Sequence, residues 1–546
     1  MPAAAGNRGG RGLLGALAGL VAAAVGLGVG ELAAAVVGPQ SSPVVAVGSA
    51  AIPLTPEPVK QFAIQTFGTH DKTALIVGIF VLLGLYAVAV GVLALRSRRI
   101  GAAGILLFGL VGIAAAVTRP AAGTADGLPS FIGAVAGIVA LLRLVRPLSL
   151  PAEPSPGAAA PARAVVDPDD GLVQRLQEAL GAGDRKGAGM DRRRFFLTSG
   201  IAVGVAALAG GGGRLLQRRF AVAAARDQLT LPRPASPAAA LPAAADLSRA
   251  VPGLTPLITR NTDFYRIDTA LTVPQIDPAA YRLTLSGMFD TPRRFTLAEL
   301  FGRTDLIERD VTLTCVSNEV GGNLASTARW MGVPLGALLR EAGIRPASTQ
   351  LVCRSVDGMT IGTPTRSALD VDGAMLAFGM NGEPLPVEHG FPLRMVIPGL
   401  YGYVSACKWL TSIEASTFGA FDAYWVQRGW TQQGPIKVES RIDTPASQST
   451  FRAGRRAIAG VAWAQARGIS RVEVRVDQGA WRDAQLSDDV GRDLWRQWVL
   501  PEDFAAGRHT ITVRATTADG EVQPEARADP YPSGATGWHS IQVTVG

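Results

Sequence analysis

The chain of 546 residues carries 18% charged and 48% hydrophobic residues, with a formal net charge of +8. A single hydrophobic core rarely grows past roughly 250–300 residues, so two or three domains are expected. The apolar balance excludes a protein that is soluble over its whole length and predicts membrane segments. Many of the arginines flank apolar runs, where they act as topology signals, so the positive charge does not indicate a nucleic-acid partner.

Residues 1–146 contain four apolar runs and are predicted to form an α-helical transmembrane bundle in contact with membrane lipid. The last two runs are short for a full crossing, and the four cover residues 13–37, 73–95, 100–117 and 131–145. Arginines stand before the first run, after the second and at the end of the fourth, whereas the other loops carry few basic residues. The positive-inside rule therefore places the N-terminus and the end of this region in the cytoplasm.

Residues 147–190 are rich in Pro, Ala, Gly and charge, which is typical of a flexible linker, here on the cytoplasmic side. Residues 191–213 follow, with three arginines ahead of Phe195 and a mildly apolar stretch. This pattern resembles a twin-arginine export signal, and the alternative is the basic flank of an ordinary fifth transmembrane helix. The twin-arginine route carries folded proteins, which suits a chain that must bind a cofactor before export. It would place the residues after about 214 outside the cytoplasm.

The remainder of the chain divides into three parts. Residues 214–250 are rich in Pro and Ala and are predicted to be an extracytoplasmic linker. Residues 251–430 mix short alternating strands with brief helical stretches, which predicts an α+β domain without βαβ repetition. Residues 431–546 have the alternation of an all-β domain, which predicts an immunoglobulin-like sandwich. We expect four tryptophans to form its core and rim: Trp463, Trp481, Trp495 and Trp498.

The three cysteines, Cys315, Cys353 and Cys407, form neither a disulfide framework nor a zinc motif. They are too few for an iron–sulfur cluster, and none of the four histidines lies inside an apolar run, so neither a cluster nor a membrane haem is expected. The pairing of Cys353 with Cys407 in an exported disulfide stays open. Redox chemistry would therefore need a separate electron-transfer protein or the quinone pool.

Cys315 stands at the end of a predicted strand, residues 310–314, and before a polar loop that contains glycines. This position presents the thiol to a cleft, although a lone cysteine is more often a buried structural thiol. A second group of residues favours the cleft over the structural role for this thiol, because His389, Arg394 and Lys408 lie around two Pro/Gly turns. Fixed cations and exposed backbone amides suit an anionic ligand that carries a phosphate. The alternative is a set of solvated loops, but the apolar residues between the charges indicate partial burial.

These segments, in their order and spacing, resemble the sulfite oxidase family of molybdenum enzymes. The resemblance runs from about residue 260 to the C-terminus and rests on residues 314–322, 328–335, 389–394, 408–410, 436–440 and 472–481. It implies an exported α+β molybdopterin domain followed by the family's sandwich domain, which mediates homodimers in some relatives. With the predicted helices, it implies a multi-pass protein of the bacterial cell membrane whose catalytic domain lies on the extracytoplasmic side.

The resemblance also implies a single pyranopterin that holds an oxo-molybdenum centre, with the Cys315 thiolate as the protein ligand to the metal. Further residues match positions that hold the pterin and its phosphate: Asn318, His389, Arg394, Ser405 and Lys408. The spacing near the serine departs by one residue from the family pattern, which leaves its alignment open. Three more match positions near the family's substrate mouth, and the first and last of them are candidate catalytic residues: Tyr424, Trp425 and Arg428.

The implied reaction is oxygen-atom transfer, coupled to single-electron exchange with a separate partner. Sulfite oxidases carry an arginine in the loop after the cysteine, whereas residues 317–322 have none and contain Glu319. A carboxylate near the metal would repel doubly charged sulfite, so a neutral sulfoxide, either a small molecule or protein-bound oxidised methionine, fits the charge better than this oxyanion. Sulfite oxidation stays the alternative activity, and a cofactor-free, membrane-tethered binding module is the alternative class.

Overall fold

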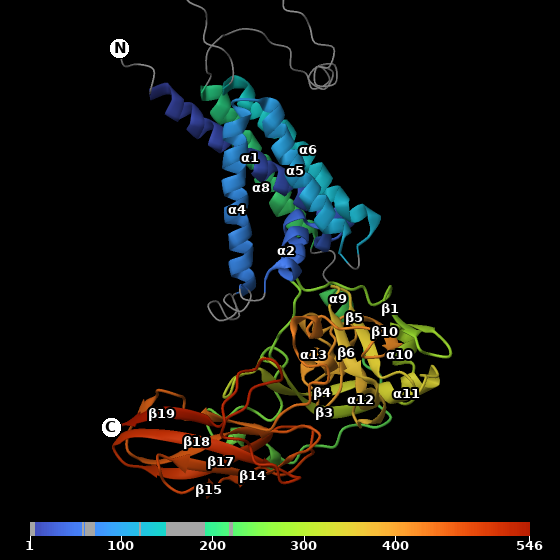
Figure 1. The fold of residues 1–546 in the computed structure, drawn as a ribbon, viewed down its shortest axis with the longest axis vertical. Coiled ribbons are helices and arrows are strands. Elements are labelled where there is room, and N and C mark those ends of the chain that lie inside the picture. Colours follow the sequence, from blue (N-terminus) through green and yellow to red (C-terminus); the bar gives the residue numbers. More distant parts are fainter. Residues whose placement is uncertain (1–5, 57–58, 60–70, 120–121, 149–191, 218–221) are drawn as a thin grey trace, which may run out of the picture. The chain divides into compact units, whose positions relative to one another are not determined.

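The computed structural model describes residues 6–56, 59, 71–119, 122–148, 192–217 and 222–546. The chain forms two compact units, Met1–Phe220 and Ala221–Gly546, which are best described one at a time (Figure 1). Most of the predicted linker at residues 147–190 lies outside the described residues.

The first unit is helical, as its apolar runs predict. Its described residues contain five helices that are long and apolar enough to cross a membrane, by length and composition. They are α1 (Gly6–Val37), α4 (Asp71–Ala94), α5 (Arg98–Val117), α6 (Leu128–Val145) and α8 (Arg192–Gln217), with the shorter helix α2 (Pro43–Leu54) after α1. Helical turns extend α6 to Thr124–Leu148, so the fourth apolar segment is longer than predicted.

Small residues let the helices of the first unit approach closely. Helix α1 packs against α4, α6 and α8. A Cβ atom on Gly19 of α1 would collide with the Ala87 carbonyl of α4, and one on Gly133 of α6 would collide with the Gly26 carbonyl of α1. Small residues at helix crossings allow such close backbone contact, which increases the van der Waals packing between the helices. The bundle therefore depends on glycine at its helix crossings.

The first part of the second unit contains two sheets and several short helices (Figure 1). One sheet has the strand order β2-β1-β10-β5-β6 and the other β3-β4-β7-β8, with β9 paired to β7. Only β1 and β10 pair in parallel, so the domain is α+β without βαβ repetition, as expected. The strands are β1 (Arg282–Gly287), β2 (Arg293–Thr296), β3 (Ile307–Thr314), β4 (Ala325–Pro334), β5 (Gln350–Ser355), β6 (Thr360–Pro364), β7 (Met375–Met380), β8 (Glu383–Pro384), β9 (Arg394–Val396) and β10 (Leu410–Ser416). The helices are α10 (Leu297–Phe301), α11 (Leu335–Glu341), α12 (Thr365–Asp370) and α13 (Gly402–Ser405).

The C-terminal part is β-rich and consists of two further sheets that share one apolar core. One sheet has the order β11-β13-β17-β16 and the other β12-β19-β18-β14-β15. Trp498 lies in their shared core, whereas Trp463 and Trp495 pack in a separate cluster with Val316 and Tyr401 of the preceding domain. These two tryptophans therefore join the two parts of the unit. The strands are β11 (Glu439–Thr444), β12 (Thr450–Phe451), β13 (Gly454–Trp463), β14 (Ile469–Val476), β15 (Arg482–Asp483), β16 (Gln485–Leu486), β17 (Arg496–Phe504), β18 (Gly507–Thr517) and β19 (His539–Val545).

The described part of the predicted linker at residues 214–250 includes a segment that packs on the folded unit, which corrects the expected start near Val251. Val222 is buried in a core cluster with Trp330, and helix α9 (Ala223–Asp227) follows it. Arg226 of α9 donates a hydrogen bond from Nε to the Leu385 carbonyl at 2.8 Å. The Pro/Ala-rich sequence of this segment shows no apolar periodicity that would indicate burial. Which of its residues are buried depends on the surface of the folded unit that the segment contacts.

This packing gives a first prediction. We expect Val222→Asp to lower the free energy of unfolding of the second unit by at least about 2 kcal/mol, because it removes a buried side chain and places a carboxylate in an apolar cluster. Ala224→Asp, at an exposed position of the same helix, is the matched control. Tryptophan fluorescence during denaturation of the full chain in detergent reports the second unit alone, because all nine tryptophans lie there. Equal stability of the two variants would show that residues 222–227 are a linker.

Candidate functional site

Cys315 begins a closed loop between two antiparallel strands. Strand β3 pairs with β4 up to Thr314 and Ala325, and the Cys315 N–H then donates to the Leu324 carbonyl at 2.9 Å. The thiol is half-buried, and its Sγ lies 2.9 Å from Ser317 Oγ. Burial raises the pKa of the Cys315 thiol, and the hydrogen bonds with Ser317 oppose part of that rise. The hairpin thus presents one thiol at the end of a strand, as the sequence predicts.

Asn318 holds this loop in shape. Its side-chain oxygen accepts a hydrogen bond from the Leu324 N–H at 2.8 Å, and its amide nitrogen donates to Glu439 of β11 at 3.1 Å. Burial raises the pKa of Glu439 to about 8, which favours a protonated carboxyl at neutral pH. Both ends of the Asn318 amide are therefore engaged within the protein. The expected contact of this residue with a cofactor stays a prediction, but its observed role is to position the loop.

The C-terminal part of the unit contacts the same loop at two more places. Arg441 of β11 donates to the Gly322 carbonyl at 3.0 Å. Gly321 has a φ of 80° and lies so close to the His539 ring that a Cβ atom would collide with it. Gln465 donates from Nε2 to Thr314 Oγ1 at 3.0 Å, just before the cysteine. The conformation of the Cys315 loop is therefore set by two domains together.

The guanidinium of Arg394 is almost completely buried among apolar side chains. The residue is 4% exposed, its Nη1 donates to the His389 carbonyl at 3.0 Å, and the guanidinium carbon lies 4.8 Å from the centre of the Trp330 ring. Its Nε has no hydrogen-bond partner among the described residues. Burial lowers the pKa of Arg394 to about 10, so the group is still charged at neutral pH. A buried cation with an unused N–H is a group that a bound anion would satisfy.

His389 is neutral at physiological pH. Burial, with the Arg394 charge, lowers its pKa to about 4 despite a backbone hydrogen bond that raises it. Nε2 lies 3.0 Å from the Asn261 carbonyl, which can only accept, so Nε2 carries the proton and Nδ1 is left as an acceptor. The ring packs edge-on against Phe264 at 5.4 Å between centres. The sequence predicted His389 as a ligand-holding residue, and the structure fixes its tautomer.

Lys408 is the second cation of the group. Its Nζ lies 2.8 Å from Asp268 and 4.5 Å from the centre of the Trp409 ring. Burial lowers the pKa of Lys408 to about 8, although Asp268 opposes that shift, and Arg394 adds to it by repulsion. A Cβ atom on Gly390 would lie 3.0 Å from Arg394 Cβ and 3.2 Å from Lys408 Cβ, so the two cationic side chains begin side by side. The sequence pattern predicted that His389, Arg394 and Lys408 form one group, and the structure brings all three together.

Tyr265 lies near the end of β3 and was not predicted from the sequence. Burial raises the pKa of its phenol, a charge on Cys315 would raise it further, and the Arg394 charge lowers it. Its hydroxyl oxygen and the carbonyl oxygen of Thr314, the residue before the cysteine, lie 3.7 and 3.8 Å from the point where a Cβ atom on Gly402 would stand. Its ring stacks on Phe264, which itself contacts His389. The available signal was the adjacent aromatic pair near the start of the domain, four residues after Asn261.

The remaining predicted site residues make local contacts of kinds that are common in folded proteins. Ser405 is fully buried, and its hydroxyl donates within its own turn to the Leu400 and Tyr401 carbonyls. Arg428 stacks its guanidinium 3.6 Å from the centre of the Tyr424 ring and donates to the Tyr424 carbonyl at 2.7 Å. Their roles in cofactor binding and catalysis stay predictions.

Trp425, between the last two residues, packs against the apolar cluster of which Val316 is also a member. The other two cysteines, Cys353 and Cys407, are free buried thiols, so the structure contains no disulfide between them. Within the described ranges, no three His, Cys, Asp or Glu side chains converge in a metal-binding group. Cys315 is the one of the three thiols that is not fully buried.

Comparisons with known proteins place this geometry in context. Residues 270–425 match the family model described as the oxidoreductase molybdopterin binding domain. The mitochondrial sulfite oxidases of Macaca fascicularis and Homo sapiens are 30% and 29% identical over 339 residues, which cover 53% of this chain and 62% of each relative. The solved sulfane dehydrogenase SoxCD from Paracoccus pantotrophus is 24% identical with a TM-score of 0.47, over 53% of this chain and 81% of that one. The chain thus spans less than two thirds of the length of the sulfite oxidases that it matches.

The lowered pKa of Lys408 gives a second prediction. The ammonium is charged at pH 7 and largely neutral at pH 9.5, because its pKa is about 8. We expect inorganic phosphate to bind the cofactor-free protein about tenfold more weakly at pH 9.5 than at pH 7.5 in calorimetric titration. Lys408→Arg keeps its charge over this range and corrects for the titration of phosphate itself. An equal loss of affinity in Lys408→Arg would exclude the lysine as its cause.

Proposed function

We propose that this chain is a membrane-anchored enzyme of oxygen-atom transfer in the sulfite oxidase family of molybdopterin-dependent oxidoreductases, and the molybdopterin-binding domain and the similarity to sulfite oxidases support this. In this proposal, Cys315 is the protein ligand to molybdenum. The catalytic domain lies on the extracytoplasmic side, and electrons are exchanged with a separate redox partner or the quinone pool.

The observation that carries the proposal is the unsatisfied guanidinium of Arg394 beside Lys408. Lys408 Nζ pairs with Asp268 at 2.8 Å, whereas the Nε of the buried Arg394 has no partner among the described residues. Leaving such a group unpaired is strongly unfavourable, so the donor set fits a bound phosphate. His389, Arg394 and Lys408 would hold the pterin and its phosphate. A binding module that has lost its cofactor would have no need of these buried charges.

The bound molybdenum–pterin group supplies the oxygen-atom and two-electron chemistry. The chain's own residues supply position and charge. The Asn318 and Arg441 hydrogen bonds fix the loop that presents the Cys315 thiolate. Arg394 stays charged at neutral pH, and neutral His389 offers Nδ1 to an N–H donor of a ligand. The Tyr265 phenol stays protonated and can donate a hydrogen bond beside the thiolate.

We further propose a neutral sulfoxide as the substrate. Glu319 is exposed in the cysteine loop and would repel a doubly charged oxyanion. Trp425 and Trp430 extend the cluster behind Val316, and Tyr531, which packs edge-on against Trp430, is 55% exposed. Aromatic surfaces favour thioether-like sulfur and apolar groups. Sulfite oxidation is the second candidate, because the matched relatives are sulfite oxidases.

The membrane part of the proposal rests on the first unit. Its described residues contain five helices that are long and apolar enough to span a bilayer, and arginines flank several of them on one predicted side. The arginines at residues 192–194 begin α8, in agreement with either an export signal or a helix flank. Export and orientation stay part of the proposal.

A third prediction tests the metal site. The full chain, expressed in a cofactor-competent host, should contain near-stoichiometric molybdenum by elemental analysis, and its absence would favour the cofactor-free binding module. Cys315→Ala should lower turnover at least about a thousandfold with an unchanged tryptophan unfolding profile, because the metal loses its thiolate. Ser317→Ala changes an exposed neighbour 2.9 Å from the thiol and should keep most of the activity. Full activity of Cys315→Ala would remove the thiolate from the mechanism.

A fourth prediction separates the two substrates. With a reducing dye, methionine sulfoxide should be turned over faster than sulfite is with an oxidising dye. Glu319→Gln should lower KM for sulfite several-fold and leave the sulfoxide reaction unchanged, because it removes only the repulsion. Glu521→Gln changes an exposed carboxylate elsewhere in the unit and is the control. Faster sulfite oxidation by the unaltered enzyme would reverse the substrate assignment.

A further inference from the structure

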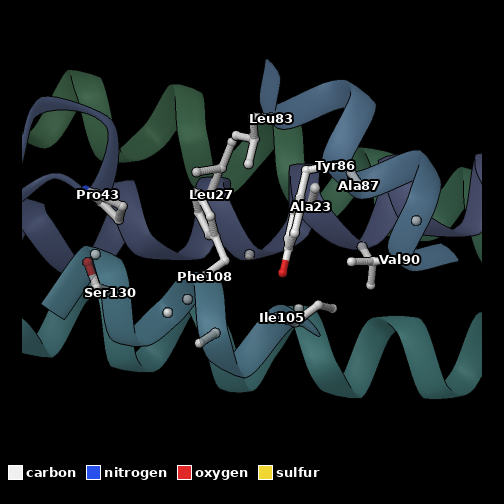
Figure 2. Close-up of a pocket in the computed structure, with 18 residues that line it drawn as sticks. Ala23, Leu27, Pro43, Leu83, Tyr86, Ala87, Val90, Ile105, Phe108 and Ser130 are labelled. Carbon is white, nitrogen blue, oxygen red and sulfur yellow. The ribbon is translucent and has the colours of Figure 1, made fainter. Parts of the chain in front are cut away.

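The first unit contains a cavity that the proposed oxygen-atom chemistry does not use. Helices α1, α4, α5 and α6 line it, together with the start of α2 (Figure 2). The empty space is about 610 Å³ when its open side is included. Figure 2 shows Pro43 and Ser130 at one end of the cavity and Val90 and Ile105 at the other. The cavity is therefore elongated, with room for a ring and a short chain rather than for a bulky cofactor.

One hydroxyl in this cavity lacks a partner. Ser130 is 4% exposed and lines the cavity, and its Oγ has no hydrogen-bond partner among the described residues. Gly112 faces it, and a Cβ atom there would lie 2.8 Å from that Oγ. A larger residue on α5 would thus fill the space beside the hydroxyl. A buried hydroxyl without a partner is unfavourable in apolar surroundings, and a ligand with a hydrogen-bond acceptor would satisfy it.

The other lining groups limit the ligand further. No charged side chain lines the cavity, so the ligand is neutral. Tyr86 and Phe108 contribute two rings, 6.3 Å apart between centres, and Tyr86 is exposed at the outer surface of the helices. Its hydroxyl donates to the Gly104 carbonyl at 2.7 Å, which leaves Ser130 as the free donor. Flat rings pack well against such aromatic and aliphatic walls. A plain acyl chain would leave the serine unsatisfied.

We propose that this cavity binds a neutral, lipid-soluble isoprenoid quinone, whose ring carbonyl accepts a hydrogen bond from Ser130 and whose chain leaves through the open side beside Tyr86. The inference concerns binding within the first unit and does not depend on the activity proposed for the second.

The test uses the full chain in lipid nanodiscs that contain no quinone. Decyl-ubiquinone is titrated by calorimetry, and decylbenzene, which has the chain and ring but no carbonyl, is the comparison ligand. The quinone should bind one saturable site, and Ser130→Ala should weaken it about fivefold through loss of one hydrogen bond. Ala23→Leu, which fills the cavity, should abolish binding. Ser199→Ala is the matched control, because that hydroxyl on α8 also lacks a partner and does not line the cavity.

Far-ultraviolet circular dichroism and gel filtration show whether each variant keeps its helices. Equal affinity of the quinone for the unaltered chain, Ser130→Ala and Ala23→Leu would mean partition into lipid and would overturn the proposal. Equal binding of decylbenzene and quinone would make the cavity a site for hydrocarbon chains, which also overturns it. Molybdenum content and sulfoxide turnover are measured on the same samples, so a failure here is distinguishable from a failure of the proposed function.

Discussion

Arg394 holds a positive charge in almost complete burial, and the His389 carbonyl is its hydrogen-bond partner among the described residues. Charges removed from water are strongly destabilising unless they are paired, so this guanidinium requires an anion. The nearby groups are consistent with that requirement. The Trp330 ring supports one face, His389 is neutral and adds no positive charge, and Lys408 supplies a second cation that Asp268 only partly offsets. The same burial that makes the group unfavourable alone would strengthen its hydrogen bonds to a bound anion.

The position of the thiol depends on a different set of contacts, most of which come from the C-terminal part of the chain. Glu439 and Arg441 are two residues apart on β11, and they hold the Cys315 loop through Asn318 and the Gly322 carbonyl. Trp463 and Trp495 belong to the same apolar cluster as Val316, the residue after the cysteine. The β-rich part therefore completes the site instead of merely following it. A change on β11 is expected to reach the thiol although β11 contributes no ligand.

The local sequence predicted the main elements of both units. Long apolar runs determine helices without any knowledge of their neighbours, because backbone groups in an apolar setting must bond within the segment. Alternation with turn residues likewise indicates strands, and the cysteine at a strand end with cations around Pro/Gly turns indicated the candidate site. Cys315, His389, Arg394 and Lys408 could thus be selected before their distances were known. The short helix α2 escaped notice because its 12 residues are too few for a membrane span.

The sequence by itself determined which segments are apolar, where the chain alternates and which side chains can bind an anion or a metal, since these are properties of neighbouring residues. Only the tertiary structure decided that Val222 is core and not linker, that Tyr265 stacks on Phe264 beside His389, and that Asn318 uses both ends of its amide within the protein. Each of these facts depends on residues that lie far away in the chain, such as Trp330 for Val222 and Glu439 for Asn318. Burial and hydrogen-bond partners at such separations are set by packing, which no local pattern encodes.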